Sequence, residues 1–536
     1  MNSGTPSIDP LAYHRLRAPQ QDGEALVELS RPTISLTPAA RQQQQRVNWQ
    51  LDLDRIACVS RAREAALQLA RRHTGSYRDL PELPDDPAAP WLMSGHQPTL
   101  FHPGVWLKNF GLSRMGTLAR GVAVNLVVDN DLAAASGLRL PLADSGTWRS
   151  ETVLWEQPTE PIPFEEKPVV DGELFRSFGE RVARAIHPLT KEPLIDSLWP
   201  VAVERHLAGE PLGRCLAAAR HVLEGELGLR TLELPLGELF DLPEVVAWTA
   251  AVLEQLDELH RVYNRGLSQF RRTHRIRSRA HPVPDLDRDE SWLESPFWVW
   301  QRSMPRRRPL WLRMSGNGFA LSDRHGWQVE GSQLREMLLD LRGQTRIRPR
   351  ALMTTLFCRT VLADLFIHGI GGAKYDQLTD AIMLEFLRIE PPAYLTMTAT
   401  VRLRGREPWR RAEQLALRRQ ELRDLVYNPQ RHLTDSQLAS EACRNLLDEK
   451  SALLSQRDQL AARHWGIGRV NEKLQPYVAE RREALIEMLE DLRRNLREDQ
   501  LLGSRELSLA LFPSQELPDK LLDLGKKVDK LSITYR

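Results

Sequence analysis

Short apolar runs and longer segments of helical periodicity alternate along the first half of the chain. The runs at residues 91–94, 122–128 and 229–236 predict buried strands, because they are short, apolar and bounded by turn residues. Residues 104–119 and 203–226 have the apolar spacing of helices. Strands that alternate with helices favour an α/β fold in which a parallel sheet is covered on both faces.

The chain before the first of these strands has a different character. Residues 1–50 are polar and irregular, and residues 52–72 predict a helix. Repeated prolines in residues 80–90 predict a stiff linker, since proline supports neither a helix interior nor an inner strand.

A β-hairpin is predicted further along the chain. Residues 308–330 contain two apolar stretches around Asn317 and Gly318, and an Asn-Gly pair in this position is the strongest short hairpin signal. Helix and strand then alternate again to about residue 403.

The C-terminal part is rich in Leu, Glu, Arg and Gln, and its pattern predicts three helices, at residues 408–426, 434–464 and 471–500. Thr434 and Gln437 form a capping box for the second helix. Gly466 and Gly468 are expected to end it.

Apolar residues in the third helix form a seam at spacings of three, four and seven: Val478, Leu485, Leu489, Leu492 and Leu496. Such a seam between charged residues is typical of a coiled coil, which implies a homodimer or an arm that closes over a neighbouring site. The alternative is a long helix packed on its own domain.

Length, composition and net charge indicate a folded protein and give no sign of a nucleic-acid or membrane partner. The length of 536 residues predicts two to four structural units, and the apolar fraction of 42% is that of a folded protein. A formal charge of +2 gives no reason to expect nucleic acid or an anionic membrane as a partner. The run at residues 305–309, Pro-Arg-Arg-Arg-Pro, is interpreted as a solvated loop.

The four cysteines are far apart and form no C-x-x-C pair, so neither a disulfide framework nor a zinc site is predicted. The N-terminus lacks the pattern of a signal peptide, and no run approaches 18 apolar residues. A cytoplasmic protein is therefore expected.

The loop after the first predicted strand has the clearest potential for chemistry. Ligands bind at the carboxyl ends of parallel strands, and the start of the next helix favours a phosphate or carboxylate. In this loop His96, Gln97 and His102 offer hydrogen-bond donors to developing negative charge. Lys108 adds a positive charge. The alternative is that the histidines brace a tight, proline-rich loop. The candidate residues are Gly95, His96, Gln97, His102, Gly104 and Lys108.

An acidic turn, Asp129-Asn130-Asp131, closes the next predicted strand and is expected beside the first loop. Its carboxylates would orient an amine, a sugar hydroxyl or a magnesium ion. The equally open alternative is that they cap the following turn.

A third segment, residues 346–382, brings an apolar stretch to a glycine-rich turn before a helix. Glycines before a helix suit an anion site, although a plain tight turn has the same pattern. The segment matches neither a P-loop nor G-x-G-x-x-G, and the chain lacks the hydrolase motifs G-x-S-x-G and H-E-x-x-H. Its candidate binding residues are Arg348, Gly371, Gly372, Lys374 and Asp376.

Together these segments resemble the bacillithiol-biosynthesis cysteine-adding enzymes, a cysteine ligase family. MSGHQPTLFHPGVWLKNF stands where the family has its T-G-Q-Q loop, and the acidic turn and the glycine-rich segment follow in the family's order. The matching residues are Gly95, Gln97, Leu100, Phe101, Lys108, Arg348, Pro349, Gly371 and Gly372. His96 replaces the family's first glutamine, and GGAKYDQ replaces its GGPGE segment.

The resemblance implies a Rossmann-like core related to class I synthetases and nucleotidyltransferases, an inserted smaller domain and a dimerising helical arm. The first loop would correspond to the HIGH loop, of which His102 and Gly104 remain. The expected parts are an N-terminal extension (1–89), the core (90–270 and 346–405), the inserted region (271–345), the coiled coil (406–502) and a C-terminal segment (503–536).

The expected function is the addition of cysteine, or a similar amino acid, to a glucosaminyl-malate-like acceptor, with ATP or another adenine nucleotide as the candidate cofactor. His96 and His102 would stabilise the reacting oxygen or phosphate, and Asp129 and Asp131 would position the amine. The alternative is a non-catalytic or differently specific relative that binds a nucleotide or sugar and dimerises through its coiled coil.

Overall fold

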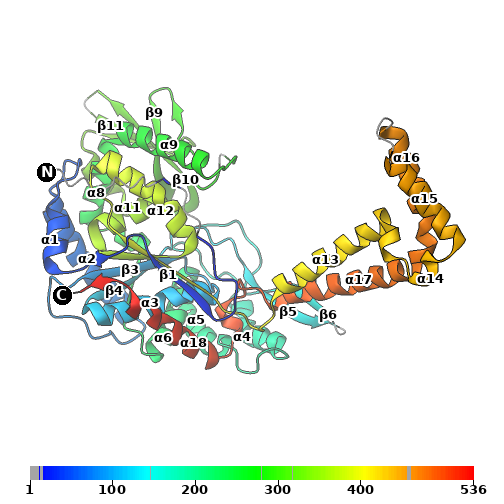
Figure 1. Ribbon diagram of the computed structural model, residues 1–536. Helices are drawn as coiled ribbons and strands as arrows, with labels where there is room; N and C mark the ends of the chain where they lie inside the picture. The colour runs from blue at the N-terminus through cyan, green and yellow to red at the C-terminus, as the bar shows by residue number, and fades with distance from the viewer. Residues whose placement is uncertain are drawn as a thin grey trace. The chain divides into compact units, whose positions relative to one another are not determined.

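The computed structural model describes residues 11–12, 16–144, 147–278, 280–316, 318–455 and 460–535. The chain divides into two compact units (Figure 1). The first comprises Met1–Leu140, Glu151–Val401 and Arg505–Arg536, and the second comprises Pro141–Ser150 and Arg402–Ser504. The two units are described separately below.

A six-stranded sheet forms the centre of the first unit, in the order β1-β15-β14-β3-β4-β7. The strands are β1 (Glu24–Leu29), β15 (Tyr394–Thr400), β14 (Leu365–His368), β3 (Trp91–His96), β4 (Val122–Val127) and β7 (Leu232–Pro235). All neighbours are parallel except β1, which pairs antiparallel with β15. The predicted mixed α/β fold with a parallel sheet is confirmed.

Helices cover both faces of this sheet, as the apolar runs predicted (Figure 1). Alternate residues such as Met93 and Leu126 belong to one large apolar cluster, which the helices of the upper face in Figure 1 complete. These are α2 (Arg55–Gly75), α8 (Pro243–Glu254), α9 (Leu256–Thr273), α11 (Ala351–Phe357) and α12 (Ile370–Ile382). The lower face carries α3 (Pro103–Ala119), α6 (Leu212–Glu226) and α18 (Glu516–Gly525).

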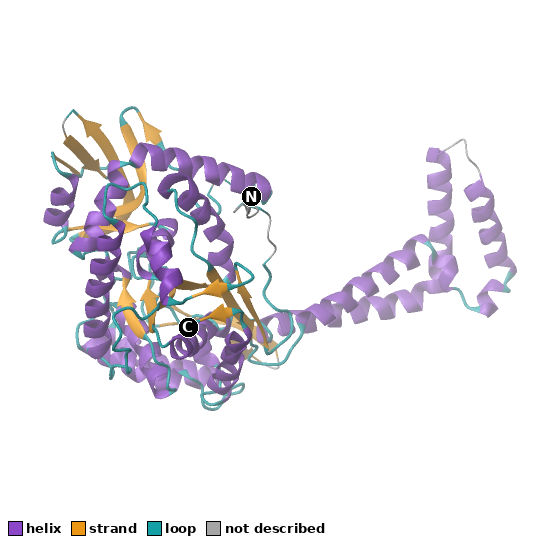
Figure 2. Ribbon diagram, turned by 60° about the vertical axis from the view of Figure 1, so that its left-hand side comes forward, coloured by secondary structure: helices purple, strands orange, loops and turns teal. Residues whose placement is uncertain are grey.

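A second sheet in the same unit is antiparallel, in the order β12-β11-β10-β9-β13 (Figure 2). It consists of β12 (Gln328–Gly331), β11 (Gly318–Ser322), β10 (Met304–Ser315), β9 (Trp292–Gln301) and β13 (Thr345–Pro349). β10 and β11 pair antiparallel from Ser315 and Gly318 onward, where a hairpin was predicted. Asn317 itself lies outside the described residues.

The expectation that residues 1–50 are irregular is wrong for the part of this segment that the structure describes, residues 11–12 and 16–50. β1 joins the main sheet, and α1 (Pro38–Arg46) begins after Thr37, whose side chain accepts a hydrogen bond from the Ala40 N–H. The strand is stabilised by pairing with β15, which is more than 350 residues away in the sequence, so its local pattern gave no signal.

The single helix predicted at residues 203–226 is two helices, α5 (Ile195–Leu207) and α6. Gly209 adopts a φ of 81°, and Pro211 lacks the N–H that a continuous helix requires, so the chain turns between them. No helix of the described residues is long and apolar enough to cross a membrane.

The helix predicted at residues 434–464 is also wrong in its extent. The capping box at Thr434 and Gln437 is present but starts the one-turn helix α14 (Asp435–Leu438), which α15 (Glu441–Ser455) follows. Gly466 and Gly468 do not end a helix, because both lie inside α16 (Leu460–Leu474). A Cβ on Gly466 would lie 2.9 Å from the Leu453 side chain, so that glycine permits close helix packing.

In the second unit, α13 (Pro408–Tyr427) packs along α17 (Ala479–Leu502). The seam predicted for a coiled coil is filled within the chain: Val478, Leu485 and Leu489 form one apolar cluster with Leu415 and Leu425 of α13. This arrangement corresponds to the alternative of a long helix packed on its own domain.

Leu489→Ala is expected to lower the free energy of unfolding of the second unit by about 2–4 kcal/mol, because it leaves a cavity between α13 and α17. Chemical denaturation followed by circular dichroism measures the change. The control is Glu490→Ala at the neighbouring exposed position, where we expect a change within about 0.5 kcal/mol. Equal losses in both variants would contradict the assignment of Leu489 to this core.

Candidate active site

The carboxyl ends of β3 and β14 form the centre of the candidate site. The chain adds β4 and β7 to one side of β3, and then adds β14 and β15 to the other side. The loops after β3 and β14 therefore diverge, which is the position at which open α/β sheets bind ligands. His96 ends β3 and His368 ends β14.

Lys108 of α3 extends to this sheet edge. Its side chain is 3% exposed, and Nζ donates a hydrogen bond to the Gly95 carbonyl oxygen at 2.7 Å. No carboxylate of the described residues pairs with it. Burial and, to a smaller extent, the charge of Arg220 lower the pKa of Lys108 to about 7. An ammonium group has three donors, so two of them lack an acceptor here.

A second buried lysine in the chain provides a comparison. Nζ of Lys450 contacts three oxygens, the Tyr427 carbonyl, the Gln430 side chain and the Asn471 side chain. All its donors are therefore satisfied, as buried polar groups require. Lys108 has one such partner, and an anion at the edge of the sheet would supply the others.

The two histidines of the first loop have different environments. Burial, followed by the charge of Lys108, lowers the pKa of His96 to about 3, so this imidazole is neutral. His102 caps α3: its Nδ1 accepts from the Gly104 N–H at 3.1 Å, and its Nε2 lies 3.4 Å from a Glu506 carboxylate oxygen. His102 therefore braces the loop with both nitrogens, whereas His96 lies beside Lys108.

The glycines of this loop serve packing. A Cβ on Gly104 would lie 2.2 Å from the Ala399 carbonyl oxygen of β15, so glycine is required where α3 crosses that strand. A Cβ on Gly95 would lie 3.2 Å from the Leu126 side chain. Gly104 was expected to admit a ligand, but β15 occupies that space.

The acidic turn lies beside the first loop, as predicted, but its groups are bonded within the protein. Asp131 accepts hydrogen bonds from Gln97 Nε2 at 3.0 Å and from Arg307 Nη1 at 2.9 Å. Asn130 Nδ2 donates to the Pro349 carbonyl oxygen at 2.8 Å. The turn thus connects β4 to the loop after β3 and to the second sheet.

Asp129 is buried and accepts a hydrogen bond from the Gly237 N–H at 2.8 Å. Burial, followed by the nearby charge of Glu165, raises the pKa of Asp129 to about 7. Asp131 is bound by protein donors and is not free to position a substrate amine, whereas the protein donor to Asp129 contacts a single oxygen, Oδ1.

Arg348 was expected to hold an anionic substrate, but two carboxylates of the protein already surround it. Its Nε and Nη2 each lie 2.9 Å from an oxygen of Glu165, and its Nη1 lies 2.9 Å from Asp241. Arg348 is 1% exposed, so the three groups form a closed network.

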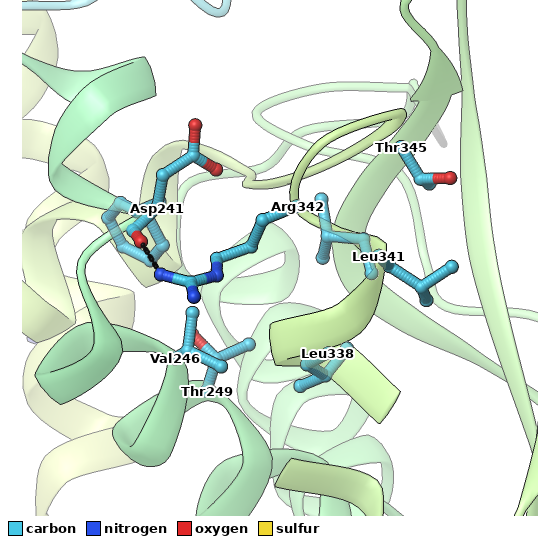
Figure 3. A pocket seen from close by; sticks show the side chains of 9 residues that line it. Asp241, Val246, Thr249, Leu338, Leu341, Arg342 and Thr345 are labelled. Atoms are coloured by element: carbon cyan, nitrogen blue, oxygen red, sulfur yellow. Dashed lines mark hydrogen bonds between the residues drawn. The ribbon is translucent and has the colours of Figure 1, made fainter. Parts of the chain in front are cut away.

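A small cavity lies near this network (Figure 3). It is lined mainly by apolar side chains such as Val246 and Leu338, and Arg342 crosses it to donate a hydrogen bond to the Asp241 carbonyl oxygen at 2.8 Å. Its volume of about 20 Å³ is near that of one water molecule, so it does not admit a substrate.

The glycine-rich turn begins α12, with Gly369 at its N-cap and with Gly371 and Gly372 exposed in the first turn. Lys374 is half-buried and forms no ion pair within the described chain. Asp376 lies in α12 just after the turn. It is 1% exposed and lies 2.9 Å from His368 Nε2, so it faces a protein partner.

His368 is the residue of the site that sequence reasoning missed. Burial lowers its pKa, although Asp376 opposes this effect. Burial raises the pKa of Asp376, but Arg359 and His368 outweigh it and hold that pKa well below its usual range. Nδ1 of His368 makes no hydrogen bond in the described residues, and a Cβ on Gly372 would lie 2.9 Å from it. Nε2 of His368 lies 2.9 Å from the Asp376 carboxylate but completes no hydrogen bond of good geometry among the described residues, so the two groups form an ionic contact at the end of β14.

A second buried network below the sheet was also missed. Glu224 accepts hydrogen bonds from Trp106 Nε1 at 2.8 Å and from Asn109 Nδ2 at 2.7 Å, and it pairs with Arg220 at 2.6 Å. Arg220 also pairs with Glu233 of β7. The spacing of Arg220 and Glu224, i and i+4 in a helix, was the available signal, but it is equally common on exposed helices.

Lys108, His96 and His368 are thus the groups at this edge that suit an anion or a proton transfer. In the described ranges, no three His, Cys, Asp or Glu side chains converge as a metal site would require. Neither a protein-family model nor a curated protein matches the chain.

Gly104→Ala is expected to lower the free energy of unfolding by about 1–3 kcal/mol, because the added methyl group collides with the backbone of β15. Urea denaturation measures the loss. Gly369→Ala is the control, since a Cβ on Gly369 would meet no atom within 4 Å. If Gly104→Ala is as stable as wild type, the close packing of α3 on β15 is wrong.

Lys108→Met is expected to raise the free energy of unfolding by about 2–4 kcal/mol at pH 7, because the folded state no longer buries an ammonium group without a counter-ion. The pKa is about 7 when folded against an ordinary 10.5, so the cost is fully present below pH 7 and disappears above pH 10.5. The gain should therefore shrink between pH 7 and pH 10.

Urea denaturation at both pH values measures this difference. Lys450→Met is the matched control, and it should lower stability because it leaves oxygen acceptors unpaired. A loss of stability in Lys108→Met at pH 7 would contradict the assignment of an unpaired buried cation.

Proposed function

We propose that this protein is an enzyme that joins an amino acid to an acceptor at the carboxyl edge of a Rossmann-like sheet. The order of the five parallel strands, β15-β14-β3-β4-β7, supports this fold. When these five strands are numbered in chain order, the sheet order is 5-4-1-2-3. Read from the other edge this is 3-2-1-4-5, the order of doubly wound nucleotide-binding folds.

The observation that carries the proposal is Lys108, a buried cation with a single carbonyl partner at the edge where β3 and β14 meet. Three arginines of the same unit, Arg220, Arg348 and Arg359, each lie between two carboxylates. Lys108 has none. A phosphate or carboxylate of a substrate would supply the missing charge and the missing acceptors.

His368 is the proposed general base. Asp376 lies 2.9 Å from its Nε2, and the proposed tautomer carries the proton on that nitrogen, which leaves the lone pair on Nδ1 to accept a proton from the attacking amine. The amine nitrogen then forms a bond to the acyl carbon. The bond between that carbon and the leaving-group oxygen breaks, and the leaving group keeps the electron pair. Nδ1 of the neutral His96 donates to the Gln97 carbonyl oxygen at 3.2 Å, so its Nε2 could only accept a hydrogen bond from the substrate, and Lys108 would stabilise the oxyanion.

The resemblance to the cysteine-adding enzymes specifies the reaction: an amide bond between cysteine, or a similar amino acid, and a glucosaminyl-malate-like acceptor. A free carboxylate is a poor acyl donor, so it needs activation. A phosphate group fits beside Lys108, because two of the three donors of its ammonium group lack an acceptor there. ATP would supply the activation of the carboxylate when bound.

The helical unit belongs to the same proposal as a homodimerisation arm. Its predicted seam is filled within the chain, but Leu417 and Tyr427 of α13 are each 61% exposed. Exposed apolar side chains on such an arm suit a second copy of the chain. The four cysteines are free and buried, which agrees with the reducing cytoplasm that we propose as its location.

The test is a coupled binding and turnover assay with cysteine, glucosaminyl malate and ATP. We expect a rise in the thermal midpoint with at least one of them, and an amide product by mass spectrometry. His368→Gln should lower the rate about 100-fold or more, because it removes the base. Lys108→Met should abolish the thermal shift by the anionic ligand.

Lys530→Met, at an exposed position of the same unit, is the control and should keep full activity. Binding without product in wild type would favour the non-catalytic relative. The absence of both a thermal shift and a product with all three compounds would overturn the ligase assignment.

A further inference from the structure

An open hollow of about 1000 Å³ lies where α9 ends and the chain turns back. Four arginines and two aspartates line it, which gives a net charge of +2. The remaining lining is largely small or apolar, namely Ser268, Ile276, Ala280 and Pro284. Its volume is that of a small-molecule site.

Two of its arginines have no polar partner among the residues that the structure describes. Arg271 pairs with Asp285 at 2.7 Å, and Arg272 donates a hydrogen bond to Ser268 Oγ at 3.1 Å. Arg275 and Arg277, in contrast, are exposed and form no ion pair or side-chain hydrogen bond within the described chain. Their guanidinium groups are available to an anion from solvent.

Arg275 occupies a backbone position that normally selects glycine. It follows the C-terminus of α9 with a φ of 54°, and the Ile276 N–H bonds back to the Arg271 carbonyl oxygen at 2.9 Å. This is the residue that ends a helix in a left-handed conformation, where a side chain is disfavoured. An arginine there is less stable than a glycine would be, and the same conformation occurs at Arg120, so the strain serves as a control in the test below and the unpaired guanidinium groups carry the argument.

We propose that this hollow binds a small ligand that carries two or more phosphate groups. Guanidinium groups recognise phosphate oxygens through paired hydrogen bonds, and Arg275 and Arg277 are two residues apart in the sequence and both line the hollow. Ile276 and Pro284 offer apolar contact to an organic part of the ligand. This proposal uses none of the residues of the proposed ligase site and does not depend on it.

The test is isothermal titration of the full chain with inorganic tripolyphosphate and with ATP. Lys108→Met is used as the background, so that binding at the main sheet does not contribute. Arg275→Gly and Arg277→Gln should each weaken binding of tripolyphosphate about tenfold. Tighter binding of ATP than of tripolyphosphate would add a nucleoside contact, and equal binding would assign recognition to the phosphates alone; both support the site.

Arg275→Gly should also raise the thermal midpoint by about 1 °C, because it relieves the backbone strain. Arg120→Gly is the matched control: Arg120 also ends a helix, has a φ of 46° and is exposed. It should raise the midpoint equally and leave the affinity unchanged.

Three results would overturn the proposal. The first is no binding of either compound to the Lys108→Met background. The second is unchanged affinity in both Arg275→Gly and Arg277→Gln. The third is much tighter binding of an RNA oligonucleotide that depends on these arginines, which would assign the surface to nucleic acid instead.

Discussion

The burial of positive charge beside the parallel sheet is the constraint on which the rest of the first unit depends. A guanidinium group taken out of water must be neutralised and hydrogen-bonded, or the fold loses several kcal/mol. The first unit meets this demand with three arginine networks, each built on two carboxylates. The arginines are Arg220, Arg348 and Arg359.

These networks also determine which polar residues remain for chemistry. Once Arg348 is held by Glu165 and Asp241, it cannot neutralise a substrate. Once Asp131 accepts from Gln97 and Arg307, it connects loops. The same charge pairing that stabilises the fold therefore removes most of the obvious candidates from the site.

The sequence predicted the core elements well because their signals are local. A buried parallel strand such as β4 is a continuous apolar run, and α3 and α13 have clear helical spacing. The failures depend on contacts between distant residues. β1 forms because it pairs with β15. α16 continues through Gly466 because the absence of a side chain there lets Leu453 pack closely against the helix.

The sequence predicted where the candidate site lies, but not the role of each polar residue in it. The turns after β3, β4 and β14 do contain polar residues, since side chains at strand ends are visible in a sequence. Their roles are not visible, because a carboxylate that binds a substrate and one that accepts from Arg307 have the same local pattern.

In the sequence His368 is only the last residue before the glycine-rich turn, and the fold brings Asp376 to 2.9 Å from it. The same fold leaves Lys108 without a carboxylate while it supplies two to each neighbouring arginine. Arg55 of the same unit is likewise buried with only a carbonyl partner, that of Val47, so the feature that distinguishes Lys108 is its position at the edge where β3 and β14 meet. That position is a property of the three-dimensional fold, so no residue pattern along the chain contains it.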